Sequence, residues 1–249
     1  DAHYLMRGNR WWRYALSLDG AEIIHDALEE NGVTPVFDSG VDHFTTDDDG
    51  VVTGAVDPNG EEYGGEFVGV AIGLNFNTEF LRDTEVELDD GIVVDEYMQT
   101  NVEDVYAAGD ITRFYDTILD DYTQNGAWGS AKEQGAVAGQ NMVADDEAEA
   151  FRWVSSYSIT HFDFPFLSFG HPTLGDDHAE QKYSDTEWRR LAFKDGKLVG
   201  GVLIGDLAPQ SKYKQLIREE REVADQKEVL LEQDVDLENL DAPAAAETE

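Results

Sequence analysis

The stretch from Thr100 to Asp110 constrains the fold more than any other part of the chain, because an apolar run in it ends on a glycine and a carboxylate. The run from Val105 to Ala108 has the length and bounds of an interior β-strand, and Gly109 gives the backbone room for close approach by a ligand. Asp110 would then lie at the carboxyl end of this strand, where open α/β sheets bind their ligands. A carboxylate there accepts strong hydrogen bonds from sugar-alcohol hydroxyl groups. An ordinary strand followed by an aspartate that caps a helix is the alternative.

The residues from Thr100 to Asp110 fit the order T-x-x-x-x-[VI]-[YF]-A-x-G-D. This order resembles the second flavin motif of the pyridine nucleotide-disulfide oxidoreductase family, whose members have two dinucleotide-binding domains. Ferredoxin and rubredoxin reductases, NADH oxidases and lipoamide dehydrogenases belong to that family. The resemblance implies that Asp110 holds the ribitol chain of FAD and that Gly109 lies beside the cofactor.

Two neighbouring segments extend the resemblance. Val68 to Leu81 is similar to the strand and G-x-x-P-N turn that link the family's nicotinamide domain back to its flavin domain, with Gly73 as the glycine of the turn. Phe76 replaces the usual proline, so the turn is expected to be less rigid. The residues 91–100 are similar to the segment that leads into the flavin motif.

The family's chains also carry two glycine-rich G-x-G-x-x-G motifs, and this sequence contains neither. Asp1 to Arg10 resembles the second strand of the nicotinamide domain, which follows that domain's glycine-rich turn. We therefore expect the chain to be the C-terminal portion of a longer flavoprotein. We expect no signal peptide and no segment long enough to span a bilayer.

The charge balance indicates the environment. The chain has 54 acidic and 17 basic residues and a formal net charge of −37, while hydrophobic residues make up 41% of it. The apolar content is enough for a core, so disorder throughout the chain is the weaker interpretation. Repulsion among carboxylates destabilises a compact state in dilute buffer and is screened at molar salt, where the Debye length falls to about 3 Å. We therefore expect a protein from the salt-rich cytoplasm of a halophile.

The composition also limits the partners. An acidic surface made for a basic partner would concentrate carboxylates on one segment, but they are spread along the chain. Nucleic acid is not an expected partner, because so negative a surface repels phosphates. Cysteine is absent, which excludes a disulfide framework and a cysteine-ligated metal in these residues. His161 with Asp163 is too sparse to indicate a metal site, and the sequence identifies no catalytic residues.

A helix is expected over residues 126–142, with Ala127, Ala131 and Ala138 as a small packing face. It is similar to the family helix whose amino end points at the flavin pyrimidine ring. The backbone at Ala127 and Trp128 would then face that ring, and the positive end of the helix would stabilise an anionic reduced flavin. Trp128 matches a tryptophan of the ferredoxin-reductase branch. The alternative for Trp128 is an aromatic side chain packed at the start of the helix.

The predicted fold class is α/β plus α+β. Residues 1–74 form a partial NAD(P)-binding domain, with a helix that a capping box opens at Asp19 and strands at residues 33–37, 51–56 and 66–72. Residues 75–150 form the returning half of a Rossmann-like FAD-binding domain. Residues 151–233 form an antiparallel C-terminal domain, and residues 234–249 form an acidic, mobile tail.

The C-terminal domain is expected to contain strands at residues 151–157 and 162–169, a hairpin turning at Asp195-Gly196, and a helix over 209–218. It resembles the domain that packs over the flavin or against a second subunit in the family, which implies a homodimer. His171 lies in an H-P-T-L order like that of lipoamide dehydrogenases, where the histidine is an acid/base partner. The hairpin follows this motif instead of preceding it, so a loop histidine is preferred to a catalytic one.

Cofactor preference depends on the end of the first strand. NADH-preferring relatives have an acidic residue where this chain has Met6, which is followed by Arg7, Arg10 and Arg13. These arginines could bind the 2′-phosphate of NADPH, and local pairing with surface acids is the alternative.

The sequence therefore predicts an oxidoreductase that passes hydride from NAD(P)H to FAD and electrons to a redox protein or a small acceptor. The alternative is a non-catalytic structural or dimerisation piece that binds no flavin, because both phosphate loops are absent. For the isolated chain this alternative is favoured, and the isolated chain is expected to be inactive.

Overall fold

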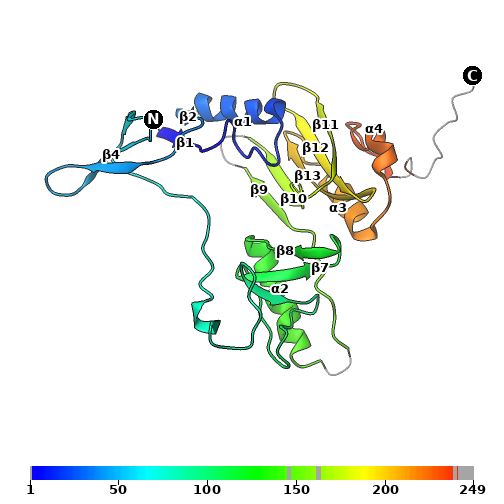
Figure 1. Ribbon diagram of the computed structural model, residues 1–249. Coiled ribbons are helices and arrows are strands. Elements are labelled where there is room, and N and C mark those ends of the chain that lie inside the picture. Colours follow the sequence, from blue (N-terminus) through cyan, green and yellow to red (C-terminus); the bar gives the residue numbers. More distant parts are fainter. Residues whose placement is uncertain (1, 145–146, 161–163, 238–239, 241–249) are drawn as a thin grey trace, which may run out of the picture.

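The computed structural model describes residues 2–144, 147–160, 164–237 and 240 (Figure 1). At the amino end, β1 (Ala2–Leu5) and β2 (Val33–Val36) form a parallel pair joined through α1 (Leu18–Glu30). The helix was expected to open at Asp19, but its N-cap is Ser17, whose side chain accepts a hydrogen bond from the Gly20 N–H at 3.4 Å. The helix ends before Gly32, as the sequence predicted.

An antiparallel meander follows, made of β3 (His43–Thr46), β4 (Val52–Val56) and β5 (Glu62–Gly64). The predicted strand at 51–56 is confirmed, whereas the one at 66–72 is wrong. The reason lies in the turn, where both the Asn59 and Glu61 N–H groups donate to Asp57 Oδ1, at 2.8 and 2.9 Å. This tight turn sends the chain straight back, so the returning strand begins at Glu62.

Residues 65–91 link the meander to the next sheet, and Figure 1 shows them as a long irregular connection between the two. Apart from the short 3₁₀ turn η1 (Glu79–Leu81), they form no helix and no strand. Large apolar side chains in the link are exposed, including Phe67 at 85% and Ile72 at 79%. Among the described residues no strand pairs with residues 66–72, so the apolar pattern there is left without a ladder.

The third sheet contains β6 (Ile92–Val94), β7 (Thr112–Asp116) and β8 (Asp121–Thr123), and α2 (Trp128–Asn141) packs on it through Ala138. The predicted helix over 126–142 is thereby confirmed within a residue or two.

The predicted interior strand at Val105–Ala108 is wrong. Only an isolated bridge joins Tyr106 to Gln99, and Val105 is 38% exposed. The backbone of this stretch closes on itself instead, because the Thr100 N–H donates to Val105 O at 2.8 Å. The buried strand is β7, so Asp110 precedes a strand and does not end one.

The C-terminal region is built on a five-stranded antiparallel sheet in the order β11-β12-β13-β10-β9. The predicted hairpin about Asp195-Gly196 and the predicted helix are confirmed, while β11 was missed. The strand predicted at 151–157 is wrong over residues 151–155, because only Ser156 and Tyr157 of it lie in β9. Residues 161–163, which contain the start of the second predicted strand and the His161–Asp163 pair, lie outside the described residues. The elements are β9 (Ser156–Ile159), β10 (Phe166–Gly170), β11 (Asp177–Lys182), β12 (Trp188–Lys194), β13 (Lys197–Ile204) and α3 (Gln210–Glu219).

Both faces of this sheet are covered. One face carries α1, and a Cβ atom on Gly20 would lie 2.9 Å from the indole ring of Trp188, which is fully buried. The other face carries α3, the turn η2 (Ala224–Gln226) and α4 (Lys227–Leu230). The amino-terminal and carboxy-terminal regions therefore share a core, with α1 as the contact.

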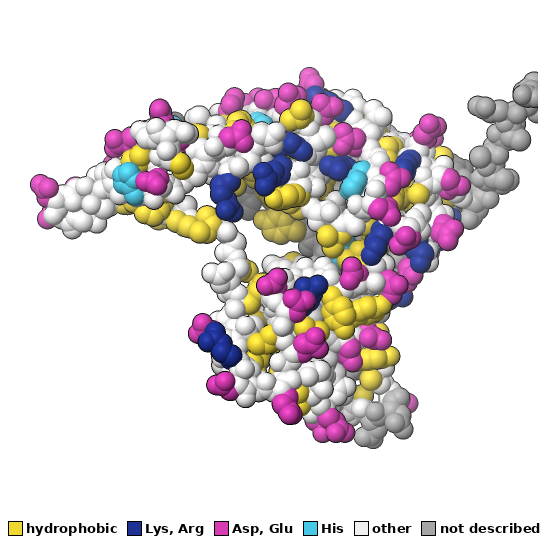
Figure 2. All heavy atoms as spheres, in the orientation of Figure 1, with side chains coloured by type: hydrophobic (Ala, Val, Ile, Leu, Met, Phe, Trp, Pro, Cys, Tyr) yellow, Lys and Arg dark blue, Asp and Glu magenta, His cyan; other side chains and the backbone are white. Residues whose placement is uncertain are grey.

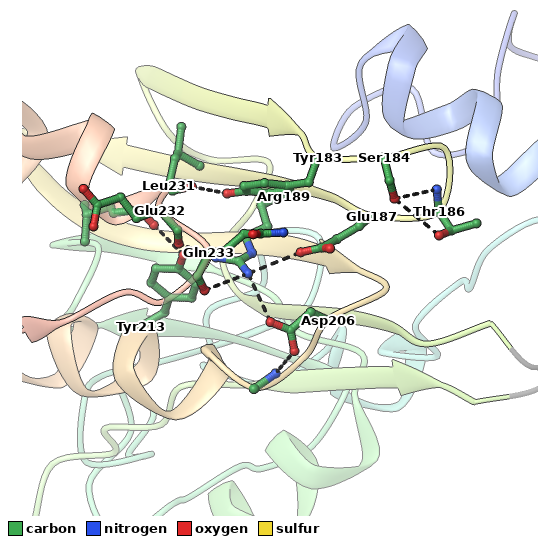
Figure 3. Close-up of polar contacts among 12 residues, drawn as sticks. Tyr183, Ser184, Thr186, Glu187, Arg189, Asp206, Tyr213, Leu231, Glu232 and Gln233 are labelled. Atoms are coloured by element: carbon green, nitrogen blue, oxygen red, sulfur yellow. Dashed lines mark hydrogen bonds and ion pairs between the residues drawn. The ribbon is translucent and has the colours of Figure 1, made fainter.

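Arg189 binds the segment that follows α4, which we call the carboxy-terminal segment, to this sheet (Figure 3). Its fully buried guanidinium donates to Glu232 O at 2.8 Å and to Gln233 O at 3.2 Å, and it lies over the Tyr183 ring. The preceding carbonyls, of Leu230 and Leu231, accept from the Tyr213 and Tyr183 hydroxyls. Burial raises the pKa of Tyr213 to about 12, so its phenol remains a donor.

The prediction of a mobile tail beginning at residue 234 is therefore wrong for the first residues of that tail. Val235 is 1% exposed and Leu240 is 3% exposed, and both belong to the core between α3 and the sheet. Residues 238–239 and 241–249 lie outside the described part of the chain.

Candidate functional site: a carboxylate cradle beside α2

Gly109 and Asp110 form a short loop just before β7, held by side chains from α2. Gly109 has a φ of +97°, a conformation that side-chain-bearing residues rarely adopt. Its N–H donates to Gln134 Oε1 at 2.7 Å, and Gln134 is fully buried. The glycine therefore allows the loop to turn and to fasten onto the helix.

Two further buried polar side chains complete this attachment. Thr112 Oγ1 lies 2.8 Å from Gly109 O and 2.9 Å from Gln134 Oε1, and its single proton serves one of them at a time. Gln134 Nε2 donates to Ser130 Oγ at 3.4 Å. None of these residues was predicted from the sequence. For Ser130 and Gln134 the available signal was their four-residue spacing with Ala138, which places polar groups on the packing face of the helix.

We call the Gly109-Asp110 loop, together with Thr112, Ser130 and Gln134, the carboxylate cradle, and Asp110 is the charged group in it. Its Oδ1 atom is buried and has no hydrogen-bond partner among the residues that the structure describes. A buried carboxylate oxygen without a donor is costly, and such atoms in folded proteins usually mark an absent water, ion or ligand. The loop thus offers a charged acceptor to a hydroxyl or other donor from outside the chain.

The amino end of α2 lies against the same loop. A Cβ atom on Gly109 would lie 4.0 Å from the Cβ of Ala131, in the first turn of the helix. The N-cap Ala127 makes no side-chain capping bond, so the first N–H groups of the helix keep their positive partial charge available. The structure therefore brings Gly109, Asp110 and the start of α2 together.

Trp128 is the first residue of α2 and is 83% exposed. The alternative of an aromatic side chain packed at the helix start is therefore wrong. The indole forms an apolar surface beside the cradle.

Gly73 and Arg7 lie on other parts of the chain. Gly73 belongs to the exposed link, and no atom lies within 4 Å of where its Cβ would be. Arg7 is exposed and comes directly after the buried Met6 at the carboxyl end of β1. The structure does not bring either residue into contact with the cradle.

The alternative of local pairing with surface acids is not seen for Arg7, Arg10 or Arg13. Among the described residues, no carboxylate lies within 4.0 Å of any of the three. Arg10 instead donates to the backbone, to Leu16 O at 2.9 Å and to Arg13 O at 3.0 Å.

His171 lies in the loop after β10, as expected, and it is buried there. Its Nε2 lies 2.8 Å from Asp116 Oδ2, at the end of β7, and both side chains are less than a tenth exposed. Burial alone would raise the pKa of Asp116, but the hydrogen bond and charge of His171, with the N–H groups of Ile118 and Leu119, hold it below its usual value. The pair lies at the opposite end of β7 from the cradle. It joins the third sheet to the C-terminal sheet and takes no part in this site.

The described residues contain no cluster of three or more histidine, aspartate and glutamate side chains that could hold a metal ion. None of the helices in the described part of the chain is both long enough and apolar enough to cross a membrane.

Comparison with known proteins identifies the class. A family model described as pyridine nucleotide-disulphide oxidoreductase matches residues 3–135, more than half of the 249 residues. A second, described as the rubredoxin NAD+ reductase C-terminal domain, matches residues 158–221. The chain therefore belongs to the pyridine nucleotide-disulfide oxidoreductase family. The family and its reductase members use FAD and NAD(P)H as cofactors.

Individual relatives agree with this assignment. The pyridine nucleotide-disulfide oxidoreductase domain-containing protein 1 of Pongo abelii is 28% identical over 194 residues, which are 73% of this chain and 39% of that protein. The NADH-rubredoxin oxidoreductase of Clostridium acetobutylicum is 27% identical over 150 residues, 59% of this chain and 37% of that protein. The chain thus spans well under half the length of these curated relatives.

A solved structure supports the fold. The ferredoxin reductase from Rhodopseudomonas palustris aligns with a TM-score of 0.83 at 17% identity, over 96% of this chain and 58% of that one.

Proposed function

We propose that this chain is part of an FAD-dependent oxidoreductase in which hydride passes from NAD(P)H to FAD and electrons pass on to an acceptor. The observation that carries the proposal is the buried, unpartnered Oδ1 atom of Asp110. The donor that this oxygen lacks matches a hydroxyl of the FAD ribitol chain, so the residues present fit the cofactor. When bound, FAD supplies the reversible uptake of hydride.

The chain's own residues bind and orient the flavin. Gln134 and Thr112 hold the Gly109 loop, and the loop fixes Asp110 as an acceptor. The first turn of α2, at Ala127 and Trp128, has no side-chain cap, so its N–H groups would hold the pyrimidine ring of the flavin and would stabilise negative charge on it. Gly73, in the link at residues 65–91, and Arg7, just after β1, are proposed to contact the bound nucleotides.

A redox protein is the proposed acceptor. Two observations support this choice: the matched relatives and structures include a rubredoxin oxidoreductase and a ferredoxin reductase, and Trp128 is an exposed aromatic side chain beside the cradle. We also propose that the C-terminal sheet region forms the contact in a homodimer. The net charge of −37 supports a protein of a salt-rich cytoplasm, where the carboxylates are screened.

An absorbance and fluorescence titration of the chain with FAD tests the flavin site. In molar KCl we expect FAD to bind with the visible spectral shift of an immobilised flavin. Asp110→Ala should weaken binding about tenfold, because a hydrogen bond to a carboxylate contributes about 1.5 kcal/mol. Glu103→Ala, an exposed acid in the same motif, is the matched control.

Equal FAD affinity in Asp110→Ala and Glu103→Ala would remove the proposed role of Asp110. A chain without any bound flavin would favour the non-catalytic structural role.

A further inference from the structure

The carboxy-terminal segment lies against the C-terminal sheet, but it is not a strand of that sheet. Among the described residues, no ladder joins the segment to a strand. Side chains hold its backbone carbonyls instead: Arg189 donates to Glu232 O and Gln233 O (Figure 3), and Lys212 donates to Val235 O. Because no strand pairing is involved, the segment can detach without unfolding the sheet.

Two apolar side chains anchor the segment in addition to these hydrogen bonds. Val235 is 1% exposed and Leu240 is 3% exposed, and both pack in the core between α3 and the sheet. Apolar contacts of this kind do not depend on charge, so they favour the attached segment at any salt concentration. The hydrogen bonds and the two anchors are therefore the interactions that keep the segment on the sheet.

The charge of the segment opposes its attachment. From Leu231 to Glu249 the chain has seven acidic residues and no lysine or arginine. The other 47 acidic and 17 basic residues give the rest of the chain a formal net charge of −30. Figure 2 shows Asp and Glu side chains distributed over the whole visible face of the molecule. A negatively charged segment therefore lies against a negatively charged domain, and the two repel each other.

The guanidinium of Arg189 does not offset this repulsion. Its Nη2 lies 3.1 Å from Asp206 Oδ2 and 3.5 Å from Glu187 Oε1, so two carboxylates outside the segment already neutralise its charge. The segment gives Arg189 only carbonyl oxygens. Within the described part of the chain, no lysine, arginine or histidine nitrogen lies within 4.0 Å of the carboxylates of Glu232 and Asp234. These two exposed carboxylates are therefore screened by the solution alone.

Salt concentration decides which of these effects prevails. The Debye length is about 3 Å at 1 M salt and about 8 Å at 0.15 M, so the repulsion is screened at high salt and acts at low salt. Lys212 supplies one positive charge against the seven carboxylates. We propose that the carboxy-terminal segment is a salt-controlled closure, which lies on the α3 face of the sheet in molar salt and detaches at low salt while the sheet stays folded. Detachment exposes Arg189 and the apolar surface under Val235, and it does not depend on flavin binding.

Thiol labelling of the full chain tests this closure, because the chain has no cysteine of its own. Val235→Cys reports on the segment, and Val202→Cys is the matched control in the sheet, where Val202 is fully buried on the α1 face. Reaction with N-ethylmaleimide, which is uncharged, is measured relative to the urea-unfolded variant at the same salt. We expect Val235→Cys to react at least about tenfold faster in about 0.15 M KCl than in about 3 M KCl. Val202→Cys should stay protected in both.

Leu240→Cys replaces Val235→Cys as the reporter if circular dichroism shows that the latter is misfolded. Equal reactivity of the reporter at both salt concentrations would overturn the proposal. Parallel labelling of the reporter and Val202→Cys at low salt would overturn it as well, because the whole domain would then unfold.

Charge removal tests the cause of detachment. Glu232→Gln combined with Asp234→Asn removes two carboxylates from the segment and should move detachment to lower salt. Asp48→Asn combined with Asp49→Asn is the control, because it removes two exposed carboxylates from the turn between β3 and β4. An equal shift in both double variants would overturn the role of the segment's own carboxylates.

Discussion

The C-terminal sheet and the link at residues 65–91 both contain apolar stretches, and they differ in what those stretches contact. Strands β12 and β13 pair along their whole length, and both faces of their sheet are covered. In the link, Phe67 and Ile72 are exposed and no strand among the described residues pairs with them. An apolar pattern therefore becomes a strand where its ladder partner lies close by, and it remains extended chain where that partner is absent from the described residues.

The C-terminal sheet and α2 also differ in how they use tryptophan, and this gives the largest expected effect. Trp188 is fully buried between α1 and the sheet, whereas Trp128 is 83% exposed. Trp188→Ala should lower the free energy of unfolding by about 4 kcal/mol, since it leaves a cavity against Gly20. Trp128→Ala should change it by less than about 0.5 kcal/mol. Urea unfolding in molar KCl measures both, and similar losses in the two variants would contradict the shared core.

The sequence predicted the parts whose partners are local. The hairpin about Asp195-Gly196 was found because two apolar strands flank a turn dipeptide, and α2 was found from its small-residue spacing. The strand at 105–108 failed because its backbone closes onto residues 98–100, which no local pattern announces. For the candidate site, Gly109 and Asp110 were found through their motif. Gln134 and Thr112 were missed, because their role depends on a contact between a helix and a loop.

Arg189 carries the next expected effect. Its guanidinium supplies Glu232 O and Gln233 O and pairs with Asp206 at 3.1 Å. Arg189→Met keeps much of the volume and removes every donor, so we expect a loss of about 3 kcal/mol and rapid proteolysis after α4. Arg82→Met, at an exposed ion pair of the link, should have little effect. A carboxy-terminal segment that stays protease-resistant in Arg189→Met would show that the core residues Val235 and Leu240 hold it alone.

The Asp116–His171 pair tests how the third sheet is joined to the C-terminal sheet. Asp116→Asn should lower the free energy of unfolding by about 2 kcal/mol, the usual range for a hydrogen bond to a charged group. Because the pKa of Asp116 is lowered in the folded state, its contribution is complete above its usual value of 3.8 and is lost as pH falls through the folded value. The difference between wild type and Asp116→Asn should thus hold from pH 7 to 5 and shrink below about pH 4.

Asp121→Asn is the control for this pair, since Asp121 lies opposite Asp116 in the ladder and is exposed. Dilute samples are needed because the isoelectric point is near 4.1. A difference that persists unchanged to pH 3 would mean that the pair does not set the acid stability of this junction.

The smallest expected effect concerns α2, which carries Gly129, Gly135 and Gly139 and so folds less readily than a helix rich in alanine. A Cβ on Gly135 would meet no atom within 4 Å, in contrast to one on Gly20. Gly135→Ala should therefore stabilise the chain by about 1 kcal/mol, while Gly20→Ala destabilises it by forcing α1 away from Trp188. Thermal unfolding of both variants compares the two regions directly. If Gly135→Ala also destabilises the chain, then the exposed face of α2 at Gly135 packs against a surface that the described residues do not include.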